Sequence, residues 1–347
     1  MLTRSGLPER LDAAFAPFID ASGVLVGVSG GPDSMALLRL TQQWAATTGR
    51  PKIFAATVDH GLRPDSRAEA QTVAEWCATL GAPHRLLVWE GTKPATRIQE
   101  KARAARYLLL DACADELGCN VLLTAHHLDD QAETILFRMG RGSGIAGLAG
   151  MQSVSQRGGL RHGRPLLGVP KAELIRFCIE TRQPFVTDPS NADPRYARAR
   201  LRRAAPELAA AGLDAPTLSK LAGRARRADE ALRQVADAAL DRLSIANAPD
   251  LAVLDGAGLR AEPPEIVLRV LDSCIRRIGG NAATRLERLE RFTENLLAAL
   301  ERGAPFRSTI GGAIVTATRD KTVRIAPEPP RRSHCLVNKL STNSDQA

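Results

Sequence analysis

The strongest constraint on the fold is an alternation of short apolar segments with longer amphipathic ones between residues 24 and 186. The apolar segments are rich in β-branched residues and have the length of strands, whereas the intervening segments have the length of helices. Repeated strand–helix units are typical of an α/β protein with a parallel sheet. The clearest strand segments are VLVGV (24–28), KIFAATVDH (52–60), HRLLVWE (84–90) and NVLLTAHH (120–127).

Polar residues follow several of these strand segments. In open parallel sheets, ligands bind beyond the carboxyl ends of the strands. Three strand ends are therefore candidate parts of one site, namely residues 29–34, 59–62 and 126–130.

The sequence SGGPDS, residues 29–34, joins the first strand segment to a helix. A glycine-rich turn at this position lets backbone N–H groups approach an anion, and the helix N-terminus adds the positive end of its dipole. The turn has neither the lysine of the GxxxxGK loop nor the GxGxxG spacing. Asp33 would repel phosphate unless a divalent cation bridged the two, so it implies magnesium. Ser29 and Ser34 can donate hydrogen bonds to the same phosphate oxygens.

A structural alternative exists for this motif. Serine and aspartate are also favoured in helix caps, so a tight turn with a cap would use the same residues. The same alternative applies to His127, Asp129 and Glu133, which would then be solvated or capping groups at a helix start.

The sequence changes character after the proline-punctuated stretch TDPSNADPRYARARLRRAAPEL. Long helices rich in alanine, leucine and arginine follow, and an alternating segment predicts a terminal hairpin. The helices are predicted over 217–244, 264–279 and 284–302, and the hairpin over 311–326 with its turn at 319–321. We expect a catalytic domain over 1–205, a smaller, mainly helical domain over 206–328 and a disordered tail over 329–347.

The net charge of +9 and the pI near 9.7 indicate an anionic partner. Aromatic residues make up only 4%, too few for a base-stacking surface, so a nucleic acid would be held by its backbone. The six cysteines form no CxxC pair, which argues against a disulfide framework and a zinc ribbon. No apolar run approaches the ~20 residues of a membrane helix, and the N-terminus lacks a secretory signal. A cytoplasmic protein is expected.

The SGGPDS turn resembles the PP-loop of the N-type ATP pyrophosphatases, enzymes that adenylate a substrate and release pyrophosphate. Five further blocks resemble, in the same order, the tRNA(Ile)-lysidine synthetases of that superfamily. These blocks are VDHGLRPDS (58–66), ARAARY (102–107), HHLDDQAETILFRMGRGSGIAGLAGM (126–151), RPLLGVPKAEL (164–174) and DPSNADPRYAR (188–198). The sequence departs from the family at Ala199, where asparagine is expected.

The resemblance implies a two-step reaction on the wobble cytidine of an isoleucine tRNA with a CAU anticodon. ATP adenylates the carbonyl oxygen at carbon 2 of the base, and the side-chain amine of free L-lysine then attacks that carbon and expels AMP. The implied cofactors are ATP and Mg²⁺, and the partners are this tRNA and lysine, without a membrane. The oligomeric state is left open, a homodimer included.

Asp33, Asp130 and Arg106 are the candidate catalytic residues. Asp33 and Asp130 would share the magnesium ion, and Arg106 would stabilise the charge on the transferring nucleotidyl group. Candidate contacts to ATP are Ser29, Gly30, Gly31, Pro32, Asp33, Ser34, Val58, His60 and His126. Candidate contacts to lysine or tRNA are Asp130, Glu133, Arg138, Arg141, Asp188, Asn191, Arg195 and Arg198.

The basic residues of these sets have their own alternative explanations. Arg103 and Arg106 share a helix face and are equally explained as solvated surface charge. Five glycines between 140 and 150 predict a loop that brings Arg138 and Arg141 to the anticodon backbone, or a flexible connection without a partner.

Two rival functions are considered. A PP-loop enzyme of the 2-thiocytidine synthetase type is one, and the lack of a CxxC pair counts against it. A tRNA-binding protein with a degenerate ATP fold is the other, and the intact Asp33, Ser34 and Asp130 argue against it.

Overall fold

The computed structural model describes residues 6–49, 51–94, 96–186, 197–280, 284–319 and 321–329. The chain forms two compact units, Met1–Arg227 and Ala228–Ala347. The division lies within helix α9 (Ala215–Leu243), later than the boundary expected near residue 205. The reason is that α8 (Ala197–Ala210) and the first part of α9 pack against α5 (Leu128–Met139), where Ile135, Leu218 and Ala222 form a small apolar cluster.

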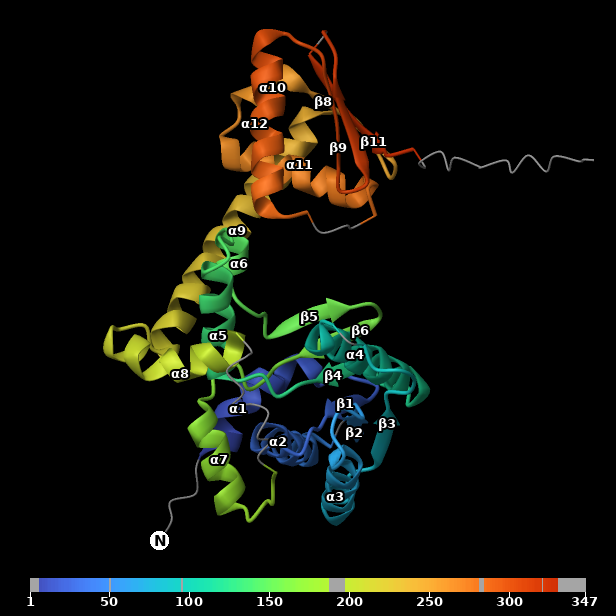
Figure 1. The fold of residues 1–347 in the computed structure, drawn as a ribbon, viewed down its shortest axis with the longest axis vertical. Helices are drawn as coiled ribbons and strands as arrows, with labels where there is room; N and C mark the ends of the chain where they lie inside the picture. Colours follow the sequence, from blue (N-terminus) through green and yellow to red (C-terminus); the bar gives the residue numbers. More distant parts are fainter. Residues whose placement is uncertain are drawn as a thin grey trace, which may run out of the picture. The chain divides into compact units, whose positions relative to one another are not determined.

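The first unit contains a six-stranded sheet in the order β3-β2-β1-β4-β6-β5 (Figure 1). All neighbouring pairs are parallel except β5 with β6, which confirms the predicted parallel sheet. The β5–β6 hairpin at the edge was not predicted. The strands are β1 (Val24–Gly27), β2 (Ile53–Asp59), β3 (His84–Val88), β4 (Val121–Leu123), β5 (Val154–Arg157) and β6 (Leu160–Gly163).

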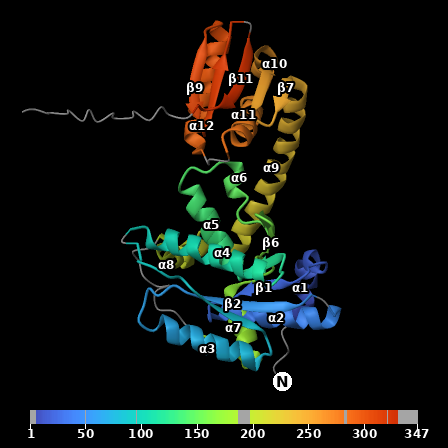
Figure 2. The same ribbon diagram turned by 90° about the vertical axis from the view of Figure 1, so that its right-hand side faces the viewer.

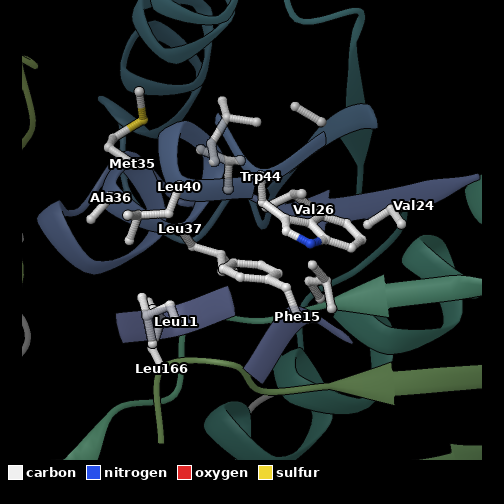
Figure 3. Close-up of a cluster of buried hydrophobic side chains, with 14 of the residues drawn as sticks. Leu11, Phe15, Val24, Val26, Met35, Ala36, Leu37, Leu40, Trp44 and Leu166 are labelled. Carbon is white, nitrogen blue, oxygen red and sulfur yellow. The ribbon is translucent and has the colours of Figure 1, made fainter. Parts of the chain in front are cut away.

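Helices cover both faces of this sheet, because successive strand residues point to opposite sides. Val24 and Val26 lie in the cluster drawn in Figure 3, which includes Phe15 and Trp44 in stacked contact, whereas Leu25 packs with Leu110 of α4. Figure 2 shows α4 on the side of the sheet away from α2 and α3. The helices around this sheet are α1 (Leu7–Phe15), α2 (Pro32–Thr48), α3 (Ser66–Thr79), α4 (Ile98–Glu116) and α7 (Lys171–Glu180).

The second unit is built on a five-stranded antiparallel sheet in the order β7-β8-β11-β10-β9. The predicted hairpin is confirmed as β10 and β11, and the three other strands extend the expected helical domain. Alternate residues such as Val315 and Ile325 are buried against Leu271 and Leu296 of the helices. The elements are β7 (Ser244–Ala248), β8 (Leu251–Asp255), α10 (Gly256–Ala261), α11 (Pro264–Ile278), α12 (Leu286–Arg302), β9 (Phe306–Ile310), β10 (Ala313–Ala317) and β11 (Thr322–Pro327).

The glycine-rich segment after α5 differs from the expected loop. It contains one helical turn, α6 (Ile145–Leu148), because the glycines still leave a short run of helix-compatible residues. Arg138 Nη1 donates to the carbonyls of Gly147 and Gly150, at 3.0 and 2.9 Å. The side chain of Gln131 is hydrogen-bonded to both the N–H and the carbonyl of Met151, which ties the segment to α5. Across the described ranges, no helix is long and apolar enough to cross a membrane.

Candidate active site

The turn after β1 has the conformation expected of an anion-binding loop. Helix α2 begins at Pro32, directly after Gly31. Gly30 has a φ of +83°, and a Cβ there would lie 2.6 Å from Cγ2 of Val73, so only glycine fits. The Ser34 hydroxyl accepts from Ser29 N–H at 3.1 Å and donates to the Gly31 carbonyl at 2.9 Å. These two hydrogen bonds fix the conformation of the turn. The expected contact between Ser34 and phosphate stays a prediction.

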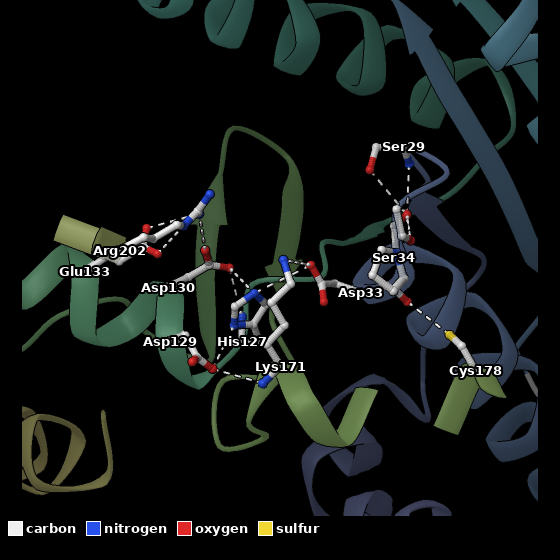
Figure 4. Close-up of polar contacts among 12 residues, drawn as sticks. Ser29, Asp33, Ser34, His127, Asp129, Asp130, Glu133, Lys171, Cys178 and Arg202 are labelled. Carbon is white, nitrogen blue, oxygen red and sulfur yellow. Dashed lines mark hydrogen bonds and ion pairs between the residues drawn. The ribbon is translucent and has the colours of Figure 1, made fainter. Parts of the chain in front are cut away.

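Asp33 lies in the first turn of α2 and faces two cationic groups (Figure 4). Its Oδ2 is 3.4 Å from Lys171 Nζ and 3.6 Å from His127 Nε2. Burial would raise the pKa of Asp33, but His127 and Lys171 outweigh it and lower the pKa, so the carboxylate is charged. Its Oδ1 is buried and has no hydrogen-bond partner within the described part of the chain.

His127 stands between the carboxylates at the start of α5. It is 3% exposed, and its ring nitrogens lie 3.4 Å from Asp129 Oδ2 and 3.4 Å from Asp130 Oδ2. Burial alone would lower the pKa of His127, but Asp129 and Asp33 raise it to about 9. Asp130 also accepts from the His127 N–H at 3.2 Å, so the capping geometry considered as an alternative is present. The positive charge of a protonated His127 thus reduces the electrostatic repulsion among the neighbouring carboxylates.

Helix α8 supplies a further cation to this cluster. Arg202 Nε and Nη2 donate to the two oxygens of Glu133, at 2.5 and 3.2 Å, and Nη2 lies 3.6 Å from Asp130 Oδ1. Burial raises the pKa of Glu133, and Arg202 opposes that shift. Ala199, on the same helix, is 5% exposed, so the position where asparagine was expected is buried here.

The end of β2 brings His60 beside Arg106. Arg106 Nε and Nη2 lie 3.3 and 3.2 Å from His60 Nε2. Burial lowers the pKa of His60 to about 4, and Arg106 adds to the shift. Gly61, with a φ of +59°, donates to Asp59 Oδ1 at 2.9 Å, and Val58 is half-buried on β2.

The expected substrate-binding arginines have separate surroundings. Arg138 is bound to the backbone carbonyls after α5, so its guanidinium has a structural role in this conformation. Arg141 lies over the ring of Phe137 at 4.1 Å, and Arg198 is exposed on α8. Asp188, Asn191 and Arg195 fall outside the described residues.

Sequence analysis missed Lys171 and gave no individual role to Arg202. Both lie in or beside blocks that resemble the family, but nothing in the linear order placed them next to Asp33 and Glu133. The packing of α7 on α2 and of α8 on α5 brings them there.

The donor set around Asp33 fits a magnesium ion. Magnesium takes oxygen ligands, is held by one or two carboxylates and completes its shell with phosphate oxygens and water. Asp33 offers a buried, unpartnered oxygen, and Asp33 Oδ2 and Asp130 Oδ2 both lie near His127 Nε2, at 3.6 and 3.4 Å. No group of three or more His, Cys, Asp or Glu side chains suited to a metal occurs among the described residues.

A glycine-rich turn from the first strand into a helix, beside two acids on a parallel sheet, is typical of PP-loop proteins. The PP-loop domain family matches residues 5–208. The U34-tRNA thiolase NcsA from Methanococcus maripaludis shares this fold, with a TM-score of 0.52 and 16% identity over 62% of this chain and 78% of that chain.

Relatives with similar sequences indicate the family within the PP-loop proteins. A tRNA(Ile)-lysidine synthase of Methylobacterium sp. (strain 4-46) is 50% identical over 94% of this chain and 96% of its own length. A tRNA(Ile)-lysidine synthase of Bradyrhizobium sp. (strain BTAi1) is 46% identical over 93% of this chain and 94% of its own. The chain belongs to the tRNA(Ile)-lysidine synthase family of PP-loop enzymes.

Proposed function

We propose that this enzyme forms lysidine in isoleucine tRNA, by ligating free L-lysine to carbon 2 of the wobble cytidine of the CAU anticodon at the expense of ATP. Family membership supports the reaction. The observation that carries the assignment of the site is the buried, unpartnered oxygen of Asp33 at a glycine-lined turn on the carboxyl edge of the sheet.

In the first step, the cytidine carbonyl oxygen forms a bond to the α-phosphorus of ATP, and the bond to the β-phosphate breaks to release pyrophosphate. Asp33 and Asp130 would hold magnesium, which neutralises the phosphate oxygens. The turn at 29–34 offers backbone N–H groups to the triphosphate, and Lys171 stands beside it. Arg106 is exposed beside His60 at the end of β2 and would stabilise the charge that develops on the nucleotide.

In the second step, the lysine Nε attacks carbon 2 of the base and the bond to the AMP oxygen breaks. Lysine carries a positive ammonium with a reference pKa of ~10.4, so acids must bind it and it must lose a proton before it attacks. Asp130 and Glu133 would supply the acids, with Asp188 as a further acid and Asn191 as a further polar contact. Because Arg202 occupies both oxygens of Glu133 here, lysine binding requires Arg202 to share or release that carboxylate.

The tRNA contacts are assigned to exposed cations. Arg141 and Arg198 are candidates on the first unit. Arg195, outside the described residues, is a further candidate, and the basic helices after residue 217 are candidates for the tRNA stem. Such an enzyme would work in the cytoplasm, where its tRNA is.

A thiolase activity is disfavoured by the state of the cysteines. Cys77, Cys113, Cys119, Cys178 and Cys274 are all buried, and burial raises the pKa of each thiol, to about 11 for Cys77, Cys119 and Cys178. Sulfur transfer needs a thiolate or a cluster ligand, and these described thiols are poorly suited to either role.

The proposal predicts a strict set of requirements for ATP turnover. Repeated release of pyrophosphate should occur only when magnesium, lysine and the cognate tRNA are all present, because without lysine the adenylated tRNA is not converted to product. A coupled pyrophosphate assay with each component omitted in turn checks this. Turnover with sulfide in place of lysine would favour a thiolase, and an absence of ATP consumption with every tRNA tried would favour a binding protein.

A further inference from the structure

A series of hydrogen bonds runs from Arg164, just after β6, through His162 and Thr124 to His126, after β4. Arg164 Nη2 lies 2.9 Å from His162 Nδ1, His162 Nε2 lies 2.9 Å from Thr124 Oγ1, and Thr124 Oγ1 lies 2.9 Å from His126 Nδ1. The Arg164 guanidinium is itself fixed, because Nη1 donates to the Gln152 carbonyl at 2.8 Å and lies 3.1 Å from Ser155 Oγ.

The chemistry of the groups fixes the direction of these hydrogen bonds from Arg164 as far as Thr124. A guanidinium can only donate, so His162 Nδ1 must accept. A neutral imidazole that accepts at one nitrogen carries its proton on the other, so His162 Nε2 donates to Thr124. The proton of the Thr124 hydroxyl remains available for His126 Nδ1, and its donation there leaves the proton of His126 on Nε2. The reverse direction would require His162 to accept at both nitrogens, with no proton on the ring.

The two rings are neutral. His162 is 3% exposed, and burial, with help from Arg164, lowers its pKa to about 3. Burial also lowers the pKa of His126 to about 2, and Arg103 adds to the shift. Both rings therefore keep a single proton through the physiological pH range.

The end of this series lies at the edge where ligands bind. Strands β1, β4 and β6 are parallel neighbours, so their carboxyl ends meet at one edge of the sheet. His126 follows β4 at that edge, as Ser29 follows β1. Its Nε2 has no hydrogen-bond partner within the described ranges and is not enclosed by the protein.

We propose that Arg164, His162 and Thr124 are positioning residues that fix the proton of His126 on Nε2, where it donates to an acceptor oxygen of the reactants. That oxygen belongs to a phosphate of ATP or is the carbonyl oxygen at carbon 2 of cytidine. A neutral donor of fixed orientation suits either oxygen, because the phosphate oxygens gain negative charge during adenylation and the cytidine oxygen gains it in the second step, when it leaves with AMP. This assignment of the acceptor rests on the proposed function, whereas the position of the proton does not.

The first test is the tautomer of His126 in the unliganded protein. Histidine labelled with ¹⁵N reports by NMR which ring nitrogen carries the proton, and the His126→Phe variant identifies the signal. We expect the proton on Nε2 in the unaltered protein and in Thr124→Ser, which keeps the hydroxyl. Thr124→Val should give a mixture of the two tautomers. A proton on Nδ1 in the unaltered protein would overturn the proposal, whatever reaction the enzyme carries out.

The second test is kinetic. Loss of a group that orients a functional side chain commonly costs between about 10- and 100-fold. Thr124→Val and His162→Phe should lower the kcat for pyrophosphate release by this factor, Thr124→Ser should restore most of it, and neither change should matter in a His126→Phe background. Equal activity of Thr124→Val and Thr124→Ser would contradict the relay. Calorimetry with magnesium and ATP distinguishes the acceptors: weaker binding by His126→Phe assigns a phosphate oxygen, and unchanged binding with a lower kcat assigns the base.

Discussion

Asp33→Asn should abolish adenylation while leaving the affinity for tRNA unchanged within about twofold. Asparagine keeps the shape of the side chain but removes the charge that would bind magnesium, and loss of one electrostatic contact to a reacting group costs on the order of 10²- to 10³-fold in kcat. The tRNA backbone is expected to bind to exposed cations elsewhere, so its affinity does not depend on this carboxylate. Pyrophosphate release measures the first quantity and filter binding the second.

Asp20→Asn is the matched control. It removes the charge of one aspartate of the same unit. Asp20 precedes β1, away from the turn at 29–34, and its Oδ1 lies 2.8 Å from Arg161 Nη1. We expect the control to retain full activity, and thermal melting of both variants separates a chemical from a folding defect. Equal losses of adenylation and tRNA affinity in Asp33→Asn would refute the role given to Asp33.

Arg106→Ala should lower the kcat for pyrophosphate release on the order of 10²- to 10³-fold, because a guanidinium placed at developing phosphate charge contributes mainly in the transition state. Arg106 is exposed on α4, and its two N–H groups point at His60 at the end of β2. The tRNA affinity should fall little, since a single surface cation contributes a small part of backbone binding.

Arg103→Ala tests whether any arginine on this helix would give the same result. Arg103 is also exposed on α4, but its Nη2 lies 3.4 Å from the hydroxyl of Tyr107, and its guanidinium lies over that ring at 5.1 Å. We expect less than a tenfold loss of kcat. If both variants lost activity equally, the two arginines would be acting through surface charge alone.

The central sheet was predictable from the sequence because its middle strands β1, β2 and β4 are largely buried and appear as apolar runs between helices. The β5–β6 hairpin was not, since its strands are short and carry polar residues such as Gln156 and Arg161. Strands β7 to β9 were missed because each is only five residues long and few of their residues are buried.

The candidate site was predicted where its residues follow strands and missed where they arrive on helices. Asp33, Asp130 and His126 each lie just beyond a strand, so the position of the sheet edge places them. Lys171 is the first residue of α7, and its Nζ lies 3.4 Å from Asp33 Oδ2. The two residues are far apart in the sequence, so no local pattern predicts this contact. The pairing of Arg202 with Glu133 likewise depends on the packing of α8 against α5.

The most direct test is the chemical identity of the product. The purified protein is incubated with ATP, magnesium, isotope-labelled lysine and a CAU-anticodon isoleucine tRNA, and the digested nucleosides are analysed by mass spectrometry. We predict that the wobble cytidine gains the mass of one lysine less one water and carries the label, while methionine tRNA with the same anticodon is unchanged. A cytidine that stays unmodified, or one in which sulfur replaces the carbonyl oxygen, would contradict the proposed function.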